Sequence, residues 1–85
     1  DPDRFLEKQH LLYGDFSVES EIAKSLTDVQ ENNKDVDIGS YPFFKAGKLG
    51  VSIVLRSPEQ KKIDKCNLEI LKFVKEKNIE LVEVS

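Results

Sequence analysis

The sequence predicts an α+β fold: a ferredoxin-like β-α-β-β-α-β sandwich, in which two helices cover one face of a four-stranded antiparallel sheet. Two observations lead to this prediction. Segments with the period of a strand and segments with the period of a helix follow one another in that order along 85 residues. The two middle strand segments are consecutive and form a hairpin, and right-handed crossovers then place the first and third strands in the centre of the sheet.

The middle hairpin is the clearest part of the pattern. Apolar residues that alternate with polar or small ones predict one strand over 36–40 and another over about 50–56. The segment 41–50 between them contains Pro42 and Gly47. Proline and glycine interrupt strands and favour turns, so this segment is expected to break the ladder and turn the chain.

Two helices are predicted on either side of the hairpin. The first has Ser17 as its N-cap and ends in a polar run, where Asn32 or Asn33 is expected to adopt the left-handed conformation. The second has Ser57 as its N-cap and Pro58 as its first helical residue. The expected apolar stripes are Val18, Ile22, Leu26 and Val29 in the first helix and Ile63, Cys66, Ile70, Phe73 and Val74 in the second.

The first and last strands complete the order of elements. A short apolar and aromatic run over 10–14 predicts the first strand, which is expected to begin near Glu7. The last strand is expected over 79–84, directly after the second helix. This leaves residues 1–6 as a flexible lead-in and residues 7–85 as a single α/β subdomain.

Composition and charge restrict the class of protein. A content of 39% hydrophobic and 34% charged residues is typical of a folded domain rather than a disordered chain. The net charge of −3 argues against nucleic acid as a partner, because nucleic-acid-binding surfaces are usually basic. No apolar run approaches the roughly 20 residues of a membrane-spanning helix, so a membrane is not an expected partner either.

The single cysteine and the single histidine do not predict a catalytic or a metal-binding site. One cysteine excludes an internal disulfide and every multi-cysteine metal site, and it indicates a reducing compartment, for which we expect the cytoplasm. Cys66 lies on the apolar stripe of the second helix and is expected to be a buried thiol. His10 is expected at the sheet surface. Asp35 and Asp37 are expected to lie in a solvated turn, because two carboxylates are too few for calcium.

The predicted fold leaves one face of the sheet without a covering layer. Apolar residues are expected on this face, namely Val54, Tyr41, Leu11 or Leu12, and Val82 or Val84. An exposed apolar patch of this kind often marks an interface. We therefore expect a partner there, either another domain of the same protein or a second copy of the chain.

Five residues of the hairpin are candidates for cofactor or ligand binding: Ser40, Tyr41, Lys45, Lys48 and Arg56. The three cationic residues among them are expected to form a small patch at one end of the hairpin. The nearby glycines do not form a phosphate loop, because that motif leads from a strand into a helix. An alternative function is therefore a stand-alone regulatory module that dimerises through the open sheet face and binds a small anionic ligand. The Tyr41–Pro42 peptide is compatible with both the cis and the trans form.

The hairpin sequence resembles a known family. Residues 38–43 (IGSYPF), a short glycine-containing loop and an apolar strand that ends in VLRS at 54–57 are similar to the end of molybdopterin-binding-type domains. These domains occur in bacterial competence/damage-inducible-like proteins and form the N-terminal half of many eukaryotic FAD synthases. The similarity covers roughly residues 8–75, with residues inserted between Asp15 and Glu19 relative to the family pattern.

The resemblance implies a C-terminal α/β subdomain that follows a parallel-sheet, nucleotide- or pterin-binding domain. The implied parent protein is an FMN adenylyltransferase, which transfers AMP from ATP to FMN with Mg²⁺. The motifs that hold the pterin or nucleotide, and the adenylyl-transferring domain, are not in this chain. We therefore expect an ancillary piece of a longer protein, with no catalytic residue and no cofactor of its own. Its first residue, Asp1 rather than methionine, agrees with this expectation.

Overall fold

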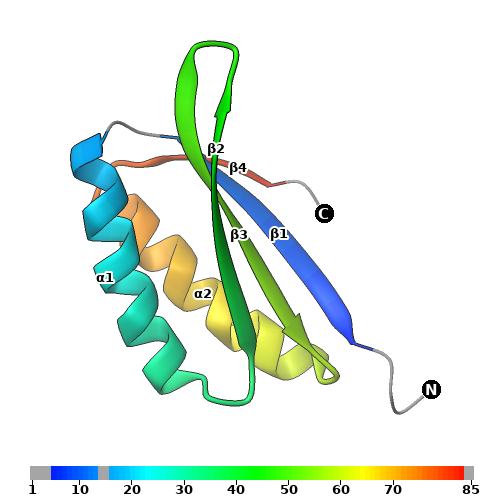
Figure 1. Ribbon diagram of the computed structural model, residues 1–85. Helices are drawn as coiled ribbons and strands as arrows, with labels where there is room; N and C mark the ends of the chain where they lie inside the picture. Colours follow the sequence, from blue (N-terminus) through cyan, green and yellow to red (C-terminus); the bar gives the residue numbers. More distant parts are fainter. Residues whose placement is uncertain (1–4, 14–15, 84–85) are drawn as a thin grey trace.

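A computed structural model of the chain describes residues 5–13 and 16–83, with the backbone alone at 16–19 and 83. Its elements are β1 (Leu6–Tyr13), α1 (Phe16–Asn32), β2 (Asp37–Lys45), β3 (Lys48–Ser57), α2 (Gln60–Glu76) and β4 (Glu80–Glu83). They follow the predicted order β-α-β-β-α-β (Figure 1).

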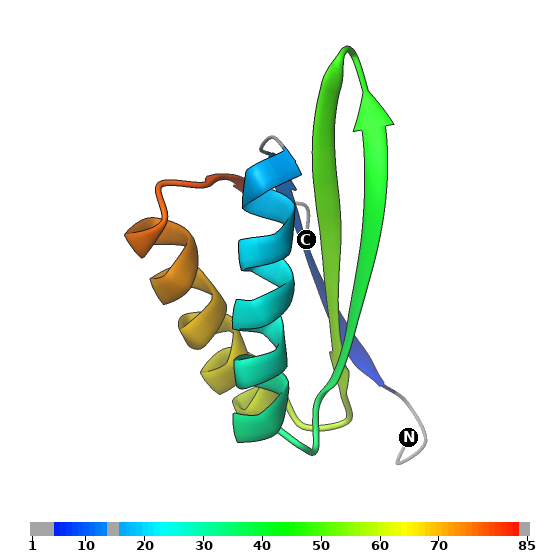
Figure 2. The same ribbon diagram turned by 60° about the vertical axis from the view of Figure 1, so that its left-hand side comes forward.

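One sheet contains all four strands, in the order β2-β3-β1-β4, so that the first and third strands lie in its centre as predicted. Every neighbouring pair is antiparallel. Both helices lie on the same side of this sheet, and its other side has no covering layer of described residues (Figure 2). The predicted ferredoxin-like α+β sandwich is therefore confirmed.

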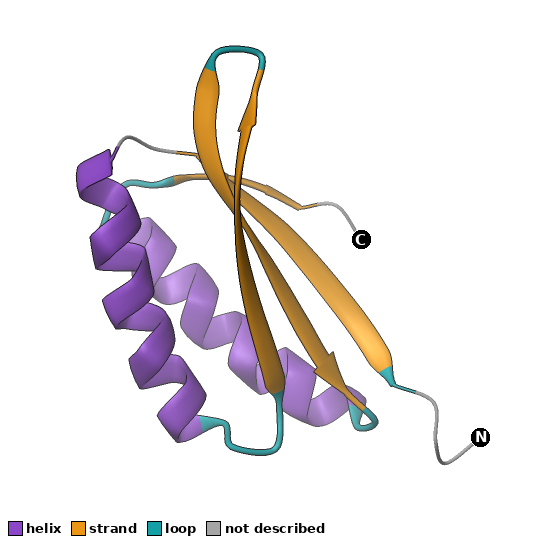
Figure 3. Ribbon diagram, in the orientation of Figure 1, coloured by secondary structure: helices purple, strands orange, loops and turns teal. Residues whose placement is uncertain are grey.

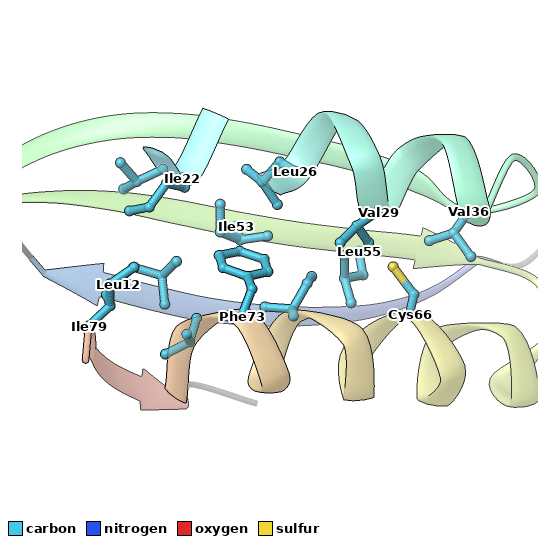
Figure 4. Packing of buried hydrophobic residues seen from close by; sticks show 13 residues of the cluster. Leu12, Ile22, Leu26, Val29, Val36, Ile53, Leu55, Cys66, Phe73 and Ile79 are labelled. Carbon is cyan, nitrogen blue, oxygen red and sulfur yellow. The ribbon is translucent and has the colours of Figure 1, made fainter. Parts of the chain in front are cut away.

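The core lies between the sheet and the two helices (Figure 4). Leu12 on β1 and Ile53 and Leu55 on β3 are completely buried, and the described part of each predicted helix stripe is buried against them. Full burial of one such aliphatic side chain stabilises the fold by roughly 1.5–3 kcal/mol. The side chain of Val18 lies outside the described residues.

The hairpin is longer than the sequence predicts. β2 and β3 remain paired from Asp37 and Arg56 to Lys45 and Lys48, so the prediction that residues 41–50 break the ladder is wrong. The turn consists of two residues at the tip (Figure 3), Ala46 with φ 54° and Gly47 with φ 78°. Positive φ at both central residues is the conformation that a two-residue hairpin turn requires.

Pro42 does not interrupt the hairpin because β2 is an edge strand. Proline lacks a backbone N–H and is accepted in a sheet where that group would point away from the neighbouring strand. Pro42 pairs with Val51 of β3 within a continuous register. The Tyr41–Pro42 peptide is trans.

The ends of α1 and α2 also differ from the prediction. α1 begins one residue before Ser17, which therefore lies inside the first turn instead of capping it. Neither Asn32 nor Asn33 has a positive φ. The Asn33 side chain instead caps the end of the helix by donating to the Val29 carbonyl at 2.8 Å. At the end of α2, by contrast, Asn78 adopts the left-handed conformation, with φ 55°.

Ser57 does not cap α2. It is the last residue of β3, is completely buried, and accepts a hydrogen bond from the backbone N–H of Glu59 at 3.1 Å. α2 begins at Gln60, whose side chain donates to Asp64 at 2.8 Å, and Pro58 precedes the helix. The hydroxyl of Ser57 thus closes a short serine turn between strand and helix.

Candidate functional site

The uncovered side of the sheet, called the open face below, is formed by alternate residues of the strands. It carries four of the apolar residues expected there: Leu11, Tyr41, Val54 and Val82. Tyr41 is 59% exposed and Val82 43% exposed. Leu12, the other possibility on β1, is buried in the core, and Val84 lies outside the described residues. The open face therefore carries the apolar residues predicted for it, together with charged residues such as Glu7, Asp37, Arg56 and Glu80.

Aromatic rings on the open face cover two glycines of the hairpin. A Cβ atom at Gly39 would come within 2.6 Å of the Tyr41 hydroxyl, so the Tyr41 ring lies over Gly39. The Phe43 ring lies in the same way over Gly50, its partner across the ladder. Phe43 also meets Tyr13 edge-on, with 5.5 Å between the ring centroids. Glycine suits these positions because the rings occupy the space of the missing side chain.

Polar contacts lie between and beside these rings. Gln9 of β1 donates from Nε2 to the hydroxyl of Ser52 on β3 at 2.7 Å, which satisfies both groups across the two central strands. Near the hairpin tip, Lys48 Nζ lies 5.7 Å from the centroid of the Tyr13 ring and 3.9 Å from the Glu80 carboxylate. The open face thus combines an aromatic cluster with satisfied polar groups, as interfaces often do.

Four of the five candidate ligand-binding residues, Tyr41, Lys45, Lys48 and Arg56, share the open face but are spread along the hairpin. Lys45 and Lys48 face each other across the turn. Arg56 lies eight residues further along β3, roughly 26 Å away at about 3.3 Å per residue. The predicted cationic patch of these three residues is therefore not formed, because the longer hairpin separates them. Ser40 is on the helix side of β2 and Tyr41 on the open face.

His10 lies in the core, and its prediction as a surface histidine is wrong. It is completely buried on the helix side of β1, two residues before Leu12. Its Nε2 is paired with Oδ1 of Asn67 on α2, while its Nδ1 has no partner among the described residues. The polar Asn67 beside the apolar stripe of α2 is the sequence signal that corresponds to this buried pair.

Cys66 is a buried thiol of α2, as predicted. Burial raises its pKa to about 11, and the nearby Glu69 carboxylate acts in the same direction. The thiol is therefore protonated at neutral pH and packed among apolar side chains. A nucleophilic cysteine needs the opposite, a lowered pKa and exposure.

Asp35 is exposed, as predicted, and forms an ion pair with α2. Its carboxylate lies 2.7 Å from Lys62 Nζ, which is also 3.0 Å from Glu59. The hydrogen bond and the charge of Lys62 lower the pKa of Asp35, and the hydrogen bond to Asp35 raises the pKa of Lys62. Within residues 5–13 and 16–83, no three His, Cys, Asp or Glu side chains gather as a metal site.

A polar cluster that the sequence analysis missed joins the end of α1 to α2. The Asn33 side chain donates to the Glu69 carboxylate at 2.5 Å, and Lys65 Nζ donates to the Asn32 carbonyl at 3.1 Å. Asn33 is buried, so its hydrogen bond to Glu69 satisfies an amide that is largely shielded from water. The cluster fixes the two helices on the sheet and leaves the open face unaffected.

The outer sides of the helices are mostly polar. The lysines of α2 are exposed or half-exposed: Lys61, Lys62, Lys65, Lys72 and Lys75. An exposed leucine, Leu68, lies among them. Neither of the two described helices has the length and apolar character required to cross a membrane.

Solved structures with this fold share little sequence with the chain. The de novo designed protein Foldit4 has a TM-score of 0.79 at 18% identity over 95% of this chain and 94% of its own. A designed protein with a ferredoxin fold, LFR1, has a TM-score of 0.65 at 14% identity over 93% and 83%. A C-terminal segment of the alpha subunit of aIF2 from Pyrococcus abyssi has 0.63 at 16% over 95% and 49%. These likenesses concern the fold alone.

A comparison of the sequence with protein families is more specific. No curated protein matches the chain. The family described as "FAD synthase, middle domain" matches residues 16–83, from the start of α1 to the end of β4. This range includes both helices, the whole hairpin and its IGSYPF segment. The chain therefore belongs to the FAD synthase middle-domain family.

Proposed function

We propose that this domain is a non-catalytic, ancillary part of a cytoplasmic FAD synthase-like protein, and that its open face packs on the nucleotide-binding domain of the same protein. The parent protein transfers AMP from Mg²⁺-bound ATP to FMN. The observation that supports this proposal is the open face, which carries apolar and aromatic residues although the core on the helix side is already complete.

The character of the open face favours a partner over bulk solvent. Antiparallel sheets with one solvated face usually carry polar residues on that face. Here the described open-face residues include the Tyr13–Phe43 ring pair and the exposed Tyr41 and Val82. Aromatic and apolar side chains exposed together on one sheet face often mark an interaction site. A domain of the same chain is the partner that we propose.

Two separate arguments support the choice of parent protein. Membership of the FAD synthase middle-domain family supports a role beside FAD synthesis. The resemblance of the IGSYPF hairpin to molybdopterin-binding-type domains supports a neighbour of that type, with the ATP, FMN and Mg²⁺ sites outside this chain. Ser40, Tyr41, Lys45, Lys48 and Arg56 remain proposals as ligand contacts, and their separation favours a role of this domain other than cofactor binding.

The docking part of the proposal is tested in the longer FAD synthase-like protein that contains this chain. Val82→Lys places a charge on the open face at a site that is already 43% exposed. We expect it to lower the melting temperature of the longer protein by several degrees and to leave that of the isolated chain almost unchanged. Leu68→Lys, at an exposed site on α2, is the matched control. Equal effects of the two variants in the longer protein would contradict docking through the open face.

The catalytic part is tested with the chain alone. We expect no FAD when the chain is incubated with FMN, ATP and Mg²⁺, and robust FAD formation would disprove the non-catalytic role. Sedimentation of the same sample distinguishes the alternative function. A monomer is expected, whereas a dimer that Val82→Lys dissociates would favour a self-associating module.

A further inference from the structure

We propose that the edge of β2 beside α1 binds an extended peptide segment, which adds to the sheet as a further strand. This site is distinct from the open face and does not depend on the function proposed above. In the described sheet, β2 has a neighbour on one side only, β3. An edge of this kind offers backbone groups to a peptide strand.

The register identifies the backbone groups at this edge. The two-residue turn makes Lys45 and Lys48 a hydrogen-bonded closing pair, and hydrogen-bonded and non-hydrogen-bonded pairs then alternate along the ladder. By this alternation, the residues whose N–H and C=O groups point away from β3 are Val36, Ile38, Ser40, Pro42 and Phe44. Their side chains all lie on the helix side of the sheet.

Two features limit the part of this edge that is available to a peptide. Pro42 has no N–H to offer, which prevents continuous pairing along the whole edge. At the other end, the carbonyl of Val36 already accepts a hydrogen bond from Gln30 Nε2 of α1 at 2.8 Å. The usable edge is therefore the short stretch between them, with Ile38 and Ser40 as its outward-facing residues.

A groove of about 360 Å³ lies beside Ile38 and Ser40. Its other lining comes from α1, with Ala23, Leu26, Thr27, Gln30 and Glu31. α1 has its close backbone neighbours in β3 and α2, which leaves this space between α1 and the edge strand. Alternate side chains of an added strand point to one face of the sheet, so one set would enter the groove.

The lining defines the chemistry of the segment. Ala23, Leu26 and Ile38 favour small aliphatic side chains, and Glu31, the charged residue among the described lining, favours a lysine or arginine on the same face of the added segment. A second copy of β2 fits less well. Paired with itself around Ser40, β2 would set Ile38 opposite Pro42 of the other copy, where a donor is missing. We therefore assign the site to an extended valine- and lysine-containing segment of another polypeptide.

The test is an NMR titration of the chain with an acetylated and amidated six-residue peptide, valine-threonine-valine-threonine-lysine-threonine, whose valines and lysine all point to the same face of the added strand. We expect the largest amide shift changes at Ile38, Ser40 and the groove residues of α1. Two further peptides carry N-methyl groups, one on the valine and lysine amides and one on the threonine amides. Strand addition uses alternate amides of the peptide, so only one of the two should lose binding. No shift change at Ile38 and Ser40, or changes confined to Leu11 and Val54, would overturn the proposal.

Proline substitutions provide the matched pair of variants. Ser40→Pro removes an outward N–H from the usable edge and preserves the pairing with β3, as Pro42 does. We expect a loss of affinity of about tenfold or more. Phe44→Pro changes an outward position beyond Pro42 and should leave the affinity unchanged. Equal effects of the two substitutions would contradict the site.

A helix variant tests the groove without altering the strand. Thr27→Arg fills the groove and pairs with Glu31 one turn later, so it should weaken binding of the valine–lysine peptide. Ser25→Arg adds the same charge to α1 on the side that faces a different groove and should have no effect. Val82→Lys, which tests the open face, should also leave peptide binding unchanged, so the two proposals fail independently.

Discussion

The two faces of the same sheet use different kinds of packing. On the helix side, β1 and β3 present aliphatic residues such as Leu12, Ile53 and Leu55, which are completely buried against α1 and α2 (Figure 4). On the open face, the hairpin presents aromatic rings laid over glycines, with Tyr41 exposed. The helix side holds the fold together, and the open face is the surface proposed to contact a partner.

The difference follows from the alternation of side chains along a strand. Val54 is half-buried on the open face, whereas its neighbours Ile53 and Leu55 are completely buried on the other. Adjacent residues of β3 therefore lie alternately in the core and on the proposed interface. Stability and partner binding should respond to separate sets of substitutions.

The largest expected effect separates the two faces directly. Leu55→Ala removes a completely buried side chain and should lower the free energy of unfolding by about 2–5 kcal/mol. Val54→Ala, one residue earlier on the open face, should lower it by less than about 1 kcal/mol. Urea unfolding of the isolated chain measures both. Similar losses would mean that the open face belongs to the core.

A second prediction concerns the polar pair on the helix side. Asn67→Leu leaves both ring nitrogens of the buried His10 without a partner and should destabilise the chain by roughly 1–3 kcal/mol. The double variant His10→Leu/Asn67→Leu should recover much of this loss, because it removes the buried polar groups together. Unfolding of the two single variants and the double variant tests the coupling. Additive losses would contradict it.

Local patterns predicted the fold because periodicity is a property of short segments. The stripe from Ile63 to Val74 and the alternation of Ile53 and Leu55 identified the elements and their order. On the open face, the sequence left Leu11 or Leu12 and Val82 or Val84 as alternatives, whereas Tyr41 and Val54 followed from the same alternation. For such residues, the neighbouring sequence alone is sufficient to assign the side chain to one face of the sheet.

The errors concern features that depend on contacts between distant segments. Pro42 resembled a strand breaker because sequence does not reveal that β2 lies at an edge of the sheet. His10 was assigned to the surface because its partner Asn67 lies 57 residues away. Arg56 was grouped with Lys48 because the length of the hairpin was underestimated. Each correction requires the register between strands or the packing of a helix.

The third prediction compares two glycines of the open face. A Cβ at Gly50 would collide with the Phe43 ring and lie 2.9 Å from the backbone oxygen of Leu12, which moves little. A Cβ at Gly39 would meet only the Tyr41 side chain, which is exposed and free to turn away. Gly50→Ala should therefore destabilise the chain by about 1–2 kcal/mol and Gly39→Ala by less.

Thermal unfolding of both alanine variants measures this difference. Phe43→Leu in the Gly50→Ala background relieves the contact with the ring and leaves the contact with the Leu12 carbonyl. We therefore expect partial recovery in the double variant. Full recovery would show that the ring alone excludes a side chain at Gly50, and that the open face adapts more readily than the helix side.

The smallest expected effect is the pH dependence of the ion pair between Asp35 and Lys62 on the exposed rim of the helix side. The pKa of Asp35 is lowered from 3.8 in the fold, so its contribution is complete above that pH and is lost as the pH falls below it. The pKa of Lys62 is raised from 10.5, so its contribution is present below that pH and lost above it. Lys62→Met should therefore flatten the dependence of stability on pH at both ends.

The effect should be small because water and salt screen an exposed pair. Unfolding of Lys62→Met is compared with that of Lys61→Met, the neighbouring exposed lysine, at neutral pH and at pH values below 3.8. The two variants should differ at neutral pH and converge in acid, where Asp35 is protonated. If their difference persists in acid, Lys62 stabilises the chain through packing of its aliphatic stem rather than through its charge. In that outcome, apolar packing would stabilise the exposed rim of the helix side, as it stabilises the core.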